Sequence, residues 1–184
     1  SKKKYQEKIK NLLSLSNLCK KTLLTDSKIQ KTSRTFIEAK GSMFLGRGYS
    51  YPIALEGALK LKELAYVHAE GYPAGEMKHG PLALIEEGMP VVVLAPRDNH
   101  YKKTISNMQE VIARGAKVLL ITNKSKDEIQ SENIWETIEV EYLSEDLFPF
   151  LTTIPLQKLA YYSAMHKGYD IDKPRNLAKS VTVE

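Results

Sequence analysis

Five consecutive apolar residues, Val91-Val92-Val93-Leu94-Ala95, form a run that is rich in β-branched side chains and holds no charge. Such a run is typical of a strand that is covered on both faces of a parallel sheet. A second run, Val118-Leu119-Leu120-Ile121, follows it, and residues 100–114 between them read as a helix that ends at Gly115. Strand, helix and strand in this order predict two parallel neighbours joined by a right-handed crossover.

The alternation of strand and helix continues on both sides of this unit. It predicts strands at 43–45 and 134–140 and helices at 51–69 and 147–167. We therefore expect an α/β fold, a three-layer α/β/α sandwich with a mainly parallel sheet. Ligands of such sheets lie beyond the carboxyl ends of the strands, so we expect the loops at 46–50, 96–99 and 122–127 to border any site.

The N-terminal part of the chain has a different composition. Residues 1–40 hold eleven Lys or Arg against three Asp or Glu, although the whole chain has a net charge of only +5. Apolar residues recur at helical spacing over 3–24, and 28–39 favours a shorter helix. We expect a helical leading segment at 1–40 and one domain at 41–184. The lysines alternate with leucines and no aromatic platform accompanies them, so we expect no nucleic-acid partner.

Several classes of protein are disfavoured by simple counts. Cys19 is the single cysteine, which excludes an internal disulfide and suits a reducing compartment, and the four histidines lack metal-ligand spacing. The apolar stretches are too short to span a membrane, and no signal peptide is recognisable, so we expect a cytoplasmic protein. Gly46-x-Gly48 fails as a dinucleotide fingerprint because the third glycine would fall at Tyr51, and no cofactor or metal is expected.

A narrow charged stripe lies on the otherwise apolar helix at 51–69. Glu56, Lys60 and Glu63 are spaced by four and three residues, which places them within about 60° of one another on a helix of about 100° per residue. The simpler interpretation is a row of salt bridges on an exposed strip. The functional interpretation is a cleft wall that holds a general base beside a cation, and the pattern alone leaves both open.

Two further segments are candidates for a site. The stretch 71–81 is a Gly- and Pro-rich loop that brings Glu76, Lys78 and His79 close together, and histidine exchanges protons near neutral pH. The tail at 172–184 has no helical or strand period, and its Arg175 and Lys179 could pair with an anionic ligand. An ordinary surface loop and a frayed tail are the alternatives.

Three motifs together resemble one family, the glutamine–fructose-6-phosphate aminotransferases. The segment from Leu45-Gly46-Arg47-Gly48 through Pro52-Ile53-Ala54-Leu55-Glu56-Gly57-Ala58-Leu59-Lys60-Leu61-Lys62-Glu63 resembles the opening of the family's second sugar-isomerase domain. Glu76-Met77-Lys78-His79-Gly80-Pro81-Leu82-Ala83-Leu84 resembles its histidine loop, and Pro174-Arg175-Asn176-Leu177-Ala178-Lys179-Ser180-Val181-Thr182-Val183-Glu184 resembles its C-terminal tail. The resemblance covers about residues 43–184 and implies a flavodoxin-like sugar-isomerase domain.

The resemblance also implies an activity and roles for single residues. The family converts fructose 6-phosphate and glutamine into glucosamine 6-phosphate and glutamate, and this part would open the sugar ring and move the proton between C1 and C2. By resemblance, Glu63 is the base, Lys60 assists it, His79 assists ring opening from a neighbouring subunit, and Lys179 engages the sugar carbonyl. Glu56 and Arg175 would orient the tail and the lysines, and Ala178 would contact the substrate.

Parts of the family's machinery have no counterpart in these 184 residues. The family's glutaminase uses an N-terminal cysteine, whereas Cys19 lies inside the chain. No phosphate-binding loop is recognisable either. We therefore expect a C-terminal fragment of a homodimer that needs the glutaminase and the first sugar-isomerase domain and makes no glucosamine 6-phosphate alone. The lack of an initial Met suggests a processed end or a fragment. The alternatives are a non-catalytic phosphosugar-binding regulatory module, an interaction domain that uses its basic helix, and a stand-alone isomerase.

Overall fold

The computed structural model of the chain describes residues 2–123 and 134–177, and within them five strands form one parallel sheet. The sheet order is β2-β1-β3-β4-β5, which is the flavodoxin-like order and confirms the predicted fold class. The strands are β1 (Ser42–Gly46), β2 (Ala69–Pro73), β3 (Pro90–Ala95), β4 (Lys117–Thr122) and β5 (Ile134–Glu139).

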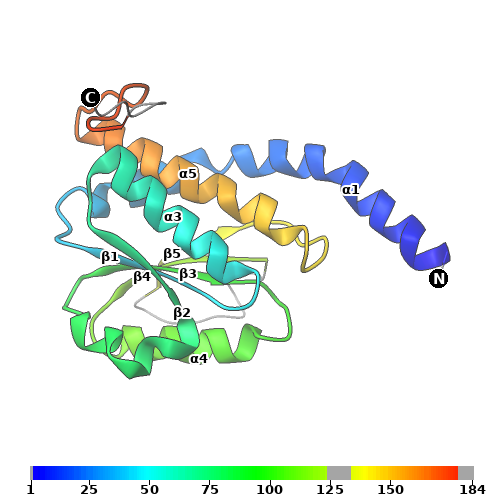
Figure 1. Ribbon diagram of the computed structural model, residues 1–184, viewed down its shortest axis with the longest axis horizontal. Helices are drawn as coiled ribbons and strands as arrows, with labels where there is room; N and C mark the ends of the chain where they lie inside the picture. Colours follow the sequence, from blue (N-terminus) through cyan, green and yellow to red (C-terminus); the bar gives the residue numbers. More distant parts are fainter. Residues whose placement is uncertain (1, 124–133, 178–184) are drawn as a thin grey trace, which may run out of the picture.

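Helices cover both faces of this sheet, as Figure 1 shows. On one face, α3 packs against α5, and α5 also contacts α1 and α2; on the other face, α4 packs against the short helix η2. The helices are α1 (Lys2–Leu23), α2 (Asp26–Ser33), α3 (Ser50–Ala65), α4 (Tyr101–Ile112) and α5 (Phe148–His166), with short 3-10 helices η1 (Arg34–Phe36), η2 (Ala74–His79) and η3 (Pro81–Leu84).

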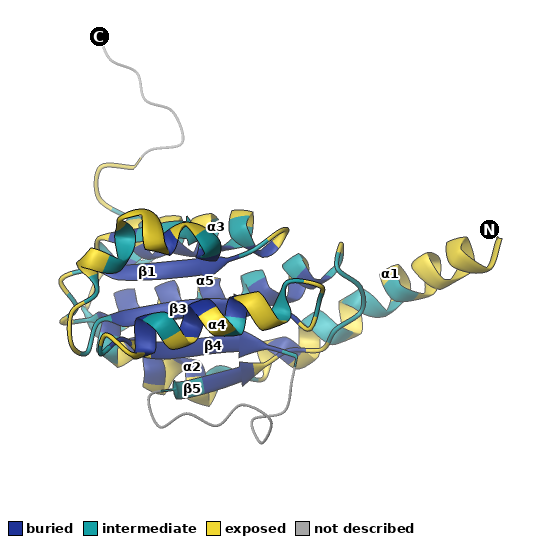
Figure 2. Ribbon diagram, turned by 90° about the horizontal axis from the view of Figure 1, so that it is seen from below, coloured by how far each residue is buried: buried dark blue, intermediate teal, exposed yellow. Residues whose placement is uncertain are grey.

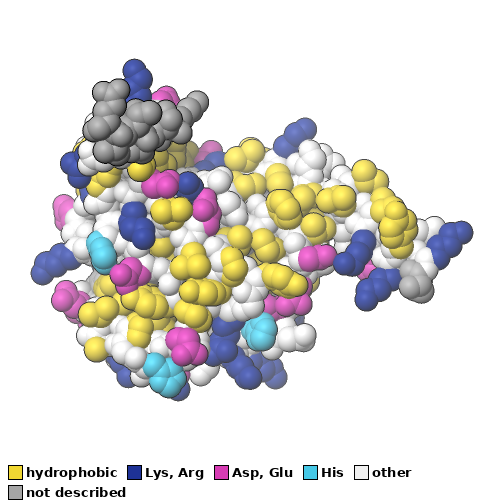
Figure 3. Space-filling view, in the orientation of Figure 1, with side chains coloured by type: hydrophobic (Ala, Val, Ile, Leu, Met, Phe, Trp, Pro, Cys, Tyr) yellow, Lys and Arg dark blue, Asp and Glu magenta, His cyan; other side chains and the backbone are white. Residues whose placement is uncertain are grey.

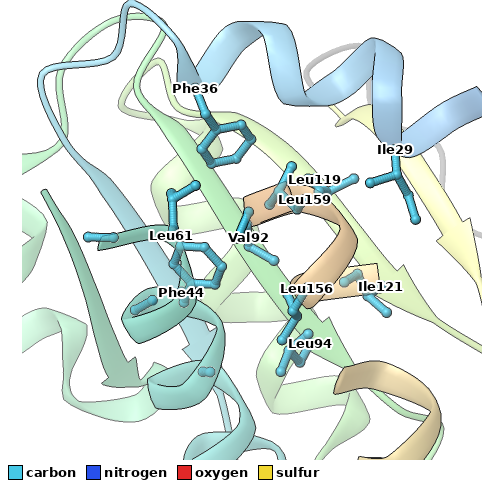
Figure 4. Packing of buried hydrophobic residues seen from close by; sticks show 14 of the residues in the cluster. Ile29, Phe36, Phe44, Leu61, Val92, Leu94, Leu119, Ile121, Leu156 and Leu159 are labelled. Carbon is cyan, nitrogen blue, oxygen red and sulfur yellow. The ribbon is translucent and has the colours of Figure 1, made fainter. Parts of the chain in front are cut away.

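The alternation of side chains along β3 and β4 divides the core into two clusters. Val92 and Leu94 point to the side of α3 and α5, while Val91 and Val93 point to the side of α4. The first cluster includes Phe44 and Leu61 and is shown in Figure 4. All of β3, and β4 from Val118 onward, are thus buried between helix layers, which is why continuous apolar runs predicted these two strands.

The prediction of one long helix at 51–69 followed by a loop at 71–81 is wrong in part. Helix α3 ends at Ala65 because Tyr66 takes a left-handed conformation, with φ at 54°. The next residues form β2, an edge strand paired only with β1 among the described strands, and η2 follows. The sequence did not predict this short strand because it contains Glu, Gly and Pro. Edge strands tolerate such residues, whereas central strands exclude them.

The predicted leading segment is helical, and from Leu15 onward it is part of the same packed body. Leu15, Leu18 and the half-buried Cys19 of α1 pack against the core, and Ile29 and Phe36 lie within it. The first half of α1 projects beyond the domain with Tyr5 and Leu13 exposed (Figures 1 and 2). The division at residue 40 stays a prediction. None of the described helices is long and apolar enough to cross a membrane.

Candidate active site on helix α3

The predicted charged stripe exists as a chain of ion pairs. Lys60 Nζ donates a 2.7 Å hydrogen bond to Glu63 Oε2 and lies 3.7 Å from Glu56 Oε1. The three side chains retain between 28% and 35% of their exposure, so they are neither buried nor fully in water. The hydrogen bond to Glu63 holds the pKa of Lys60 above its usual value, and the lysine therefore stays charged beside both carboxylates.

The packing of α3 fixes which side of the helix carries the stripe. Its small residues Ala54, Gly57 and Ala58 face the sheet and α5, where a Cβ on Gly57 would stand 2.8 Å from Leu156 Cδ1. The stripe lies outside this contact. Lys60 lines a surface cavity of about 600 Å³ between α3 and α5, and Glu63 lines another of about 540 Å³. The stripe is thus held on a rigid helix next to free volume.

The stripe lies at the opposite end of the sheet from the loops that were expected to border a site. Helix α3 starts after the carboxyl end of β1 and runs back, so Glu63 lies towards the amino ends of the strands, where Ser42 N donates to His68 O at 2.9 Å. The loops at 46–50 and 96–99 are at the other end, and residues 124–127 lie outside the described residues. The stripe therefore lies away from these loops, and the expectation that the loops border a site stays a prediction.

The first residues of the C-terminal tail return to the end of α3. The backbone N–H of Arg175 donates to the Tyr66 hydroxyl at 2.7 Å, and the Arg175 guanidinium carbon lies 4.0 Å from the centroid of the Tyr66 ring. Arg175 lines the same cavity as Glu63. The structure therefore brings Arg175 to the predicted base, while the predicted site residues Ala178 and Lys179 lie outside the described residues.

Two residues of this corner were not singled out by the sequence. Tyr66 contacts the tail, and Lys167, just after α5, donates from Nζ to the Ala65 carbonyl of α3 at 3.0 Å. Burial, together with the nearby Arg175 charge, lowers the pKa of Lys167. No local sequence pattern marks either residue. At the end of a helix the usual signal for a left-handed residue is glycine, and Tyr66 does not give it.

His79 is separated from Glu63 within one chain. It ends η2, whose Met77 packs in the cluster on the α4 side of the sheet, whereas Leu61 of α3 packs in the cluster on the other side. Its neighbour Lys78 forms a 3.0 Å ion pair with Glu110 of α4. The sheet thus stands between the predicted base and the predicted histidine, and the two cannot act on one small molecule unless His79 comes from another subunit.

The described side chains of this site are carboxylates and cations. Among residues 2–123 and 134–177, no group of three His, Cys, Asp or Glu side chains could hold a metal ion. The chemistry that the described side chains offer is proton transfer by Glu63 beside a fixed cation.

Comparisons with known proteins agree in pointing to one family. The family model described as SIS domain matches residues 35–167. Glutamine–fructose-6-phosphate aminotransferase [isomerizing] of Bartonella henselae is 50% identical over 176 residues, which are 96% of this chain and 29% of the relative. The enzyme of the same name from Bacteroides thetaiotaomicron is 52% identical over 180 residues, which are 98% of this chain and 29% of that relative.

A solved structure gives the same result. The C-terminal domain of glucosamine-fructose-6-phosphate aminotransferase from Francisella tularensis has a TM-score of 0.85 and 45% identity, covering 92% of this chain and 47% of that one. The chain therefore spans about 30% of the length of the curated relatives that it matches.

Proposed function

Because this chain belongs to the SIS domain family, we propose that it is the isomerase part of a glutamine–fructose-6-phosphate aminotransferase that carries ring opening and proton transfer. The identity of about 50% to such enzymes across nearly the whole chain supports this proposal. The single observation that carries the chemistry is the 2.7 Å hydrogen bond between Lys60 and Glu63 on an open side of α3.

Glu63 is the base of the proposed reaction. Converting the aminated ketose into the aldose requires removal of a proton from C1 and delivery of a proton to C2. One carboxylate can serve both adjacent carbons. Lys60 keeps a positive charge beside this carboxylate, so negative charge that develops on the sugar during the transfer is stabilised. Glu56 holds Lys60 from the other side at 3.7 Å.

The remaining roles come from outside the α3 stripe. Lys179 and Ala178 contact the sugar from the tail, with Lys179 at its carbonyl, and Arg175 directs the tail. His79 assists ring opening, and we place it in the site of a neighbouring subunit of a homodimer because the sheet separates it from Glu63 in its own chain. Ammonia from glutamine is supplied by a glutaminase, and the sugar phosphate is bound together with a first sugar-isomerase domain, both in a longer cytoplasmic chain.

The test uses the longer enzyme with Glu63→Gln, following glutamine hydrolysis and glucosamine 6-phosphate in the same samples. We expect the sugar product to fall by about 10²-fold or more while glutamine hydrolysis continues. Glu38→Gln is the matched control, since Glu38 is an exposed carboxylate outside α3. Near-normal sugar product from Glu63→Gln would show that Glu56, Lys60 and Glu63 form structural salt bridges only. A wild type that binds the sugar phosphate but makes no product would favour the regulatory module.

A further inference from the structure

Arg47, in the turn between β1 and α3, connects two elements that lie far apart in the sequence. Its Nε and Nη2 atoms donate to one oxygen, Asn107 Oδ1 of α4, at 3.2 and 3.0 Å. Asn107 is only 6% exposed, and Arg47 is half-buried. A charged donor makes stronger hydrogen bonds than a neutral one, so this pair holds the guanidinium against α4.

The guanidinium of Arg47 also lies against η2, the short helix that ends at His79. A Cβ on Gly75 would stand 2.6 Å from Arg47 Nη2 and 3.0 Å from Arg47 Cζ, and its three nearest neighbours would all be guanidinium atoms. Gly75 does not have a positive φ, so its backbone conformation does not require glycine. The absence of a side chain at residue 75 is therefore what lets the arginine approach η2.

Two further contacts fix η2 on the same side of the sheet. Met77 is 1% exposed and packs in the cluster on the α4 side, and Lys78 forms its 3.0 Å ion pair with Glu110 of α4. His79 ends the helix and is exposed. The body of η2 is thus held in place while its last residue points away from the core, as a residue that acts in a neighbouring subunit must do.

We propose that Arg47 is a positioning residue, which holds η2 through Gly75 on one side and Asn107 on the other and so sets the place of His79 in the site of the neighbouring subunit. This inference rests on the proposed function. Arg47 contacts no substrate in it and acts only through the histidine. A misplacement of about 1 Å can cost an enzyme about 10²-fold in rate, so loosening η2 slows the step that His79 assists.

Arg47→Ala and Gly75→Ala disturb this contact from its two sides. The first removes the guanidinium, and the second displaces it, because a methyl group at residue 75 and Nη2 cannot both stay in place. In the longer enzyme we expect each change to lower kcat/KM for fructose 6-phosphate by about tenfold. The double variant should be no worse than the more impaired single variant, because both changes remove one shared contact.

Control variants separate this contact from a general effect of losing an arginine. Arg97→Ala is the matched control, since Arg97 is exposed in the loop after β3 at the same end of the sheet, and it should keep kcat/KM within about twofold. Arg47→Lys keeps a charged donor for Asn107 and should lose only about threefold. Glutamine hydrolysis without sugar should stay unchanged in all of them. If Arg47→Ala fails to fold, Gly75→Ala and Arg47→Lys provide the same comparison.

A second substrate distinguishes the positioning of His79 from a merely structural role. The probe 5-deoxyfructose 6-phosphate lacks the hydroxyl that closes the sugar ring on C2, so it needs no ring opening. For this probe we expect Arg47→Ala and Gly75→Ala to stay within about twofold of the wild type. His79→Ala should likewise recover most of its activity with the probe, because the step that the histidine assists is absent.

Each contrary outcome overturns a different statement. Equal losses of Arg47→Ala with both sugars would show that Arg47 supports the fold and not the histidine. Additive losses in the double variant would show that Arg47 and Gly75 share no contact. A large loss of His79→Ala with the probe would remove His79 from ring opening, and the role of Arg47 would fall with it. If the wild type makes no sugar product, the proposed function itself fails, whereas an active wild type with an unaffected Arg47→Ala overturns this inference alone.

Discussion

Lys60 Nζ lies 2.7 Å from the Oε2 atom of Glu63, one helical turn away, and the pair faces open volume rather than the core. A salt bridge in such a position adds little to stability, typically about 0.2–1 kcal/mol. Removing a catalytic pair should therefore lower the rate of the reaction far more than the free energy of unfolding, whereas removing a structural pair should not lower the rate in this way. Figure 3 shows charged side chains next to apolar side chains on this face of the molecule.

Lys60→Met separates these two roles. We expect the sugar product of the longer enzyme to fall by at least about tenfold, because the base loses its adjacent cation, while the free energy of unfolding changes by less than about 1 kcal/mol. Product formation and urea unfolding are the two measurements. Lys103→Met is the control, since Lys103 is exposed on α4 on the other face of the sheet. A loss of stability equal in size to the loss of activity would argue against a catalytic pair.

His79 and Glu63 should complement each other between subunits. Mixed Glu63→Gln and His79→Ala enzymes, each inactive alone, should recover about a quarter of wild-type sugar product, because about half of randomly formed dimers are hybrids with one intact site of two. Mixing Glu63→Gln with Lys60→Met should recover nothing, since both changes lie on α3 in the same site. Equal recovery in the two mixtures, or none in the first, would place His79 in another role.

The edge strand β2 carries a pH-dependent contact. The Tyr72 hydroxyl donates to Glu70, and this hydrogen bond, aided by burial, raises the pKa of Tyr72 to about 12. In the unfolded chain the Tyr72 phenol has its ordinary pKa of 10.0. Between pH 10.0 and about 12 the unfolded state therefore binds fewer protons than the folded state, and the free energy of unfolding falls as the pH rises. The stabilisation that this hydrogen bond provides is complete below pH 10.0 and is lost as the pH rises through about 12.

A phenolate difference titration of wild type against Tyr72→Phe measures this shift. Glu70→Gln should return the pKa of Tyr72 towards its ordinary value, because the carboxylate is the main cause of the shift. A phenol that titrates normally in the wild type would show that the hydrogen bond is absent in solution.

Gly57→Ala tests the close approach of α3 to the rest of the core. The added Cβ would lie 2.8 Å from Leu156 Cδ1 and 2.9 Å from Phe44 Cδ1, and overpacking of this kind costs about 1–3 kcal/mol. Alanine favours the helix by up to about 1 kcal/mol, so we expect a net loss of about 1–2 kcal/mol in urea unfolding. Gly41→Ala, whose Cβ meets nothing closer than 3.6 Å, should be nearly neutral. Equal stability of both variants would contradict tight packing at Gly57.

The sequence by itself determined the features that depend on local periodicity. Continuous apolar runs predicted β3 and β4, because a strand covered on both faces needs apolar residues at every position. The steps of four and three residues predicted that Glu56, Lys60 and Glu63 share one side of a helix, and the ion pairs at 2.7 and 3.7 Å agree with this placement. Both inferences use neighbours within a single element.

Only the tertiary structure decided how distant segments meet. Tyr66 and Arg175 are 109 residues apart, and no periodicity links them; their contact exists because α5 packs on α3 and delivers the following residues to the end of that helix. The sheet likewise decides that His79 and Glu63 lie on opposite sides, although the sequence places them 16 positions apart. Such relationships follow from the way that buried faces pair, which the spacing of residues along the chain does not encode.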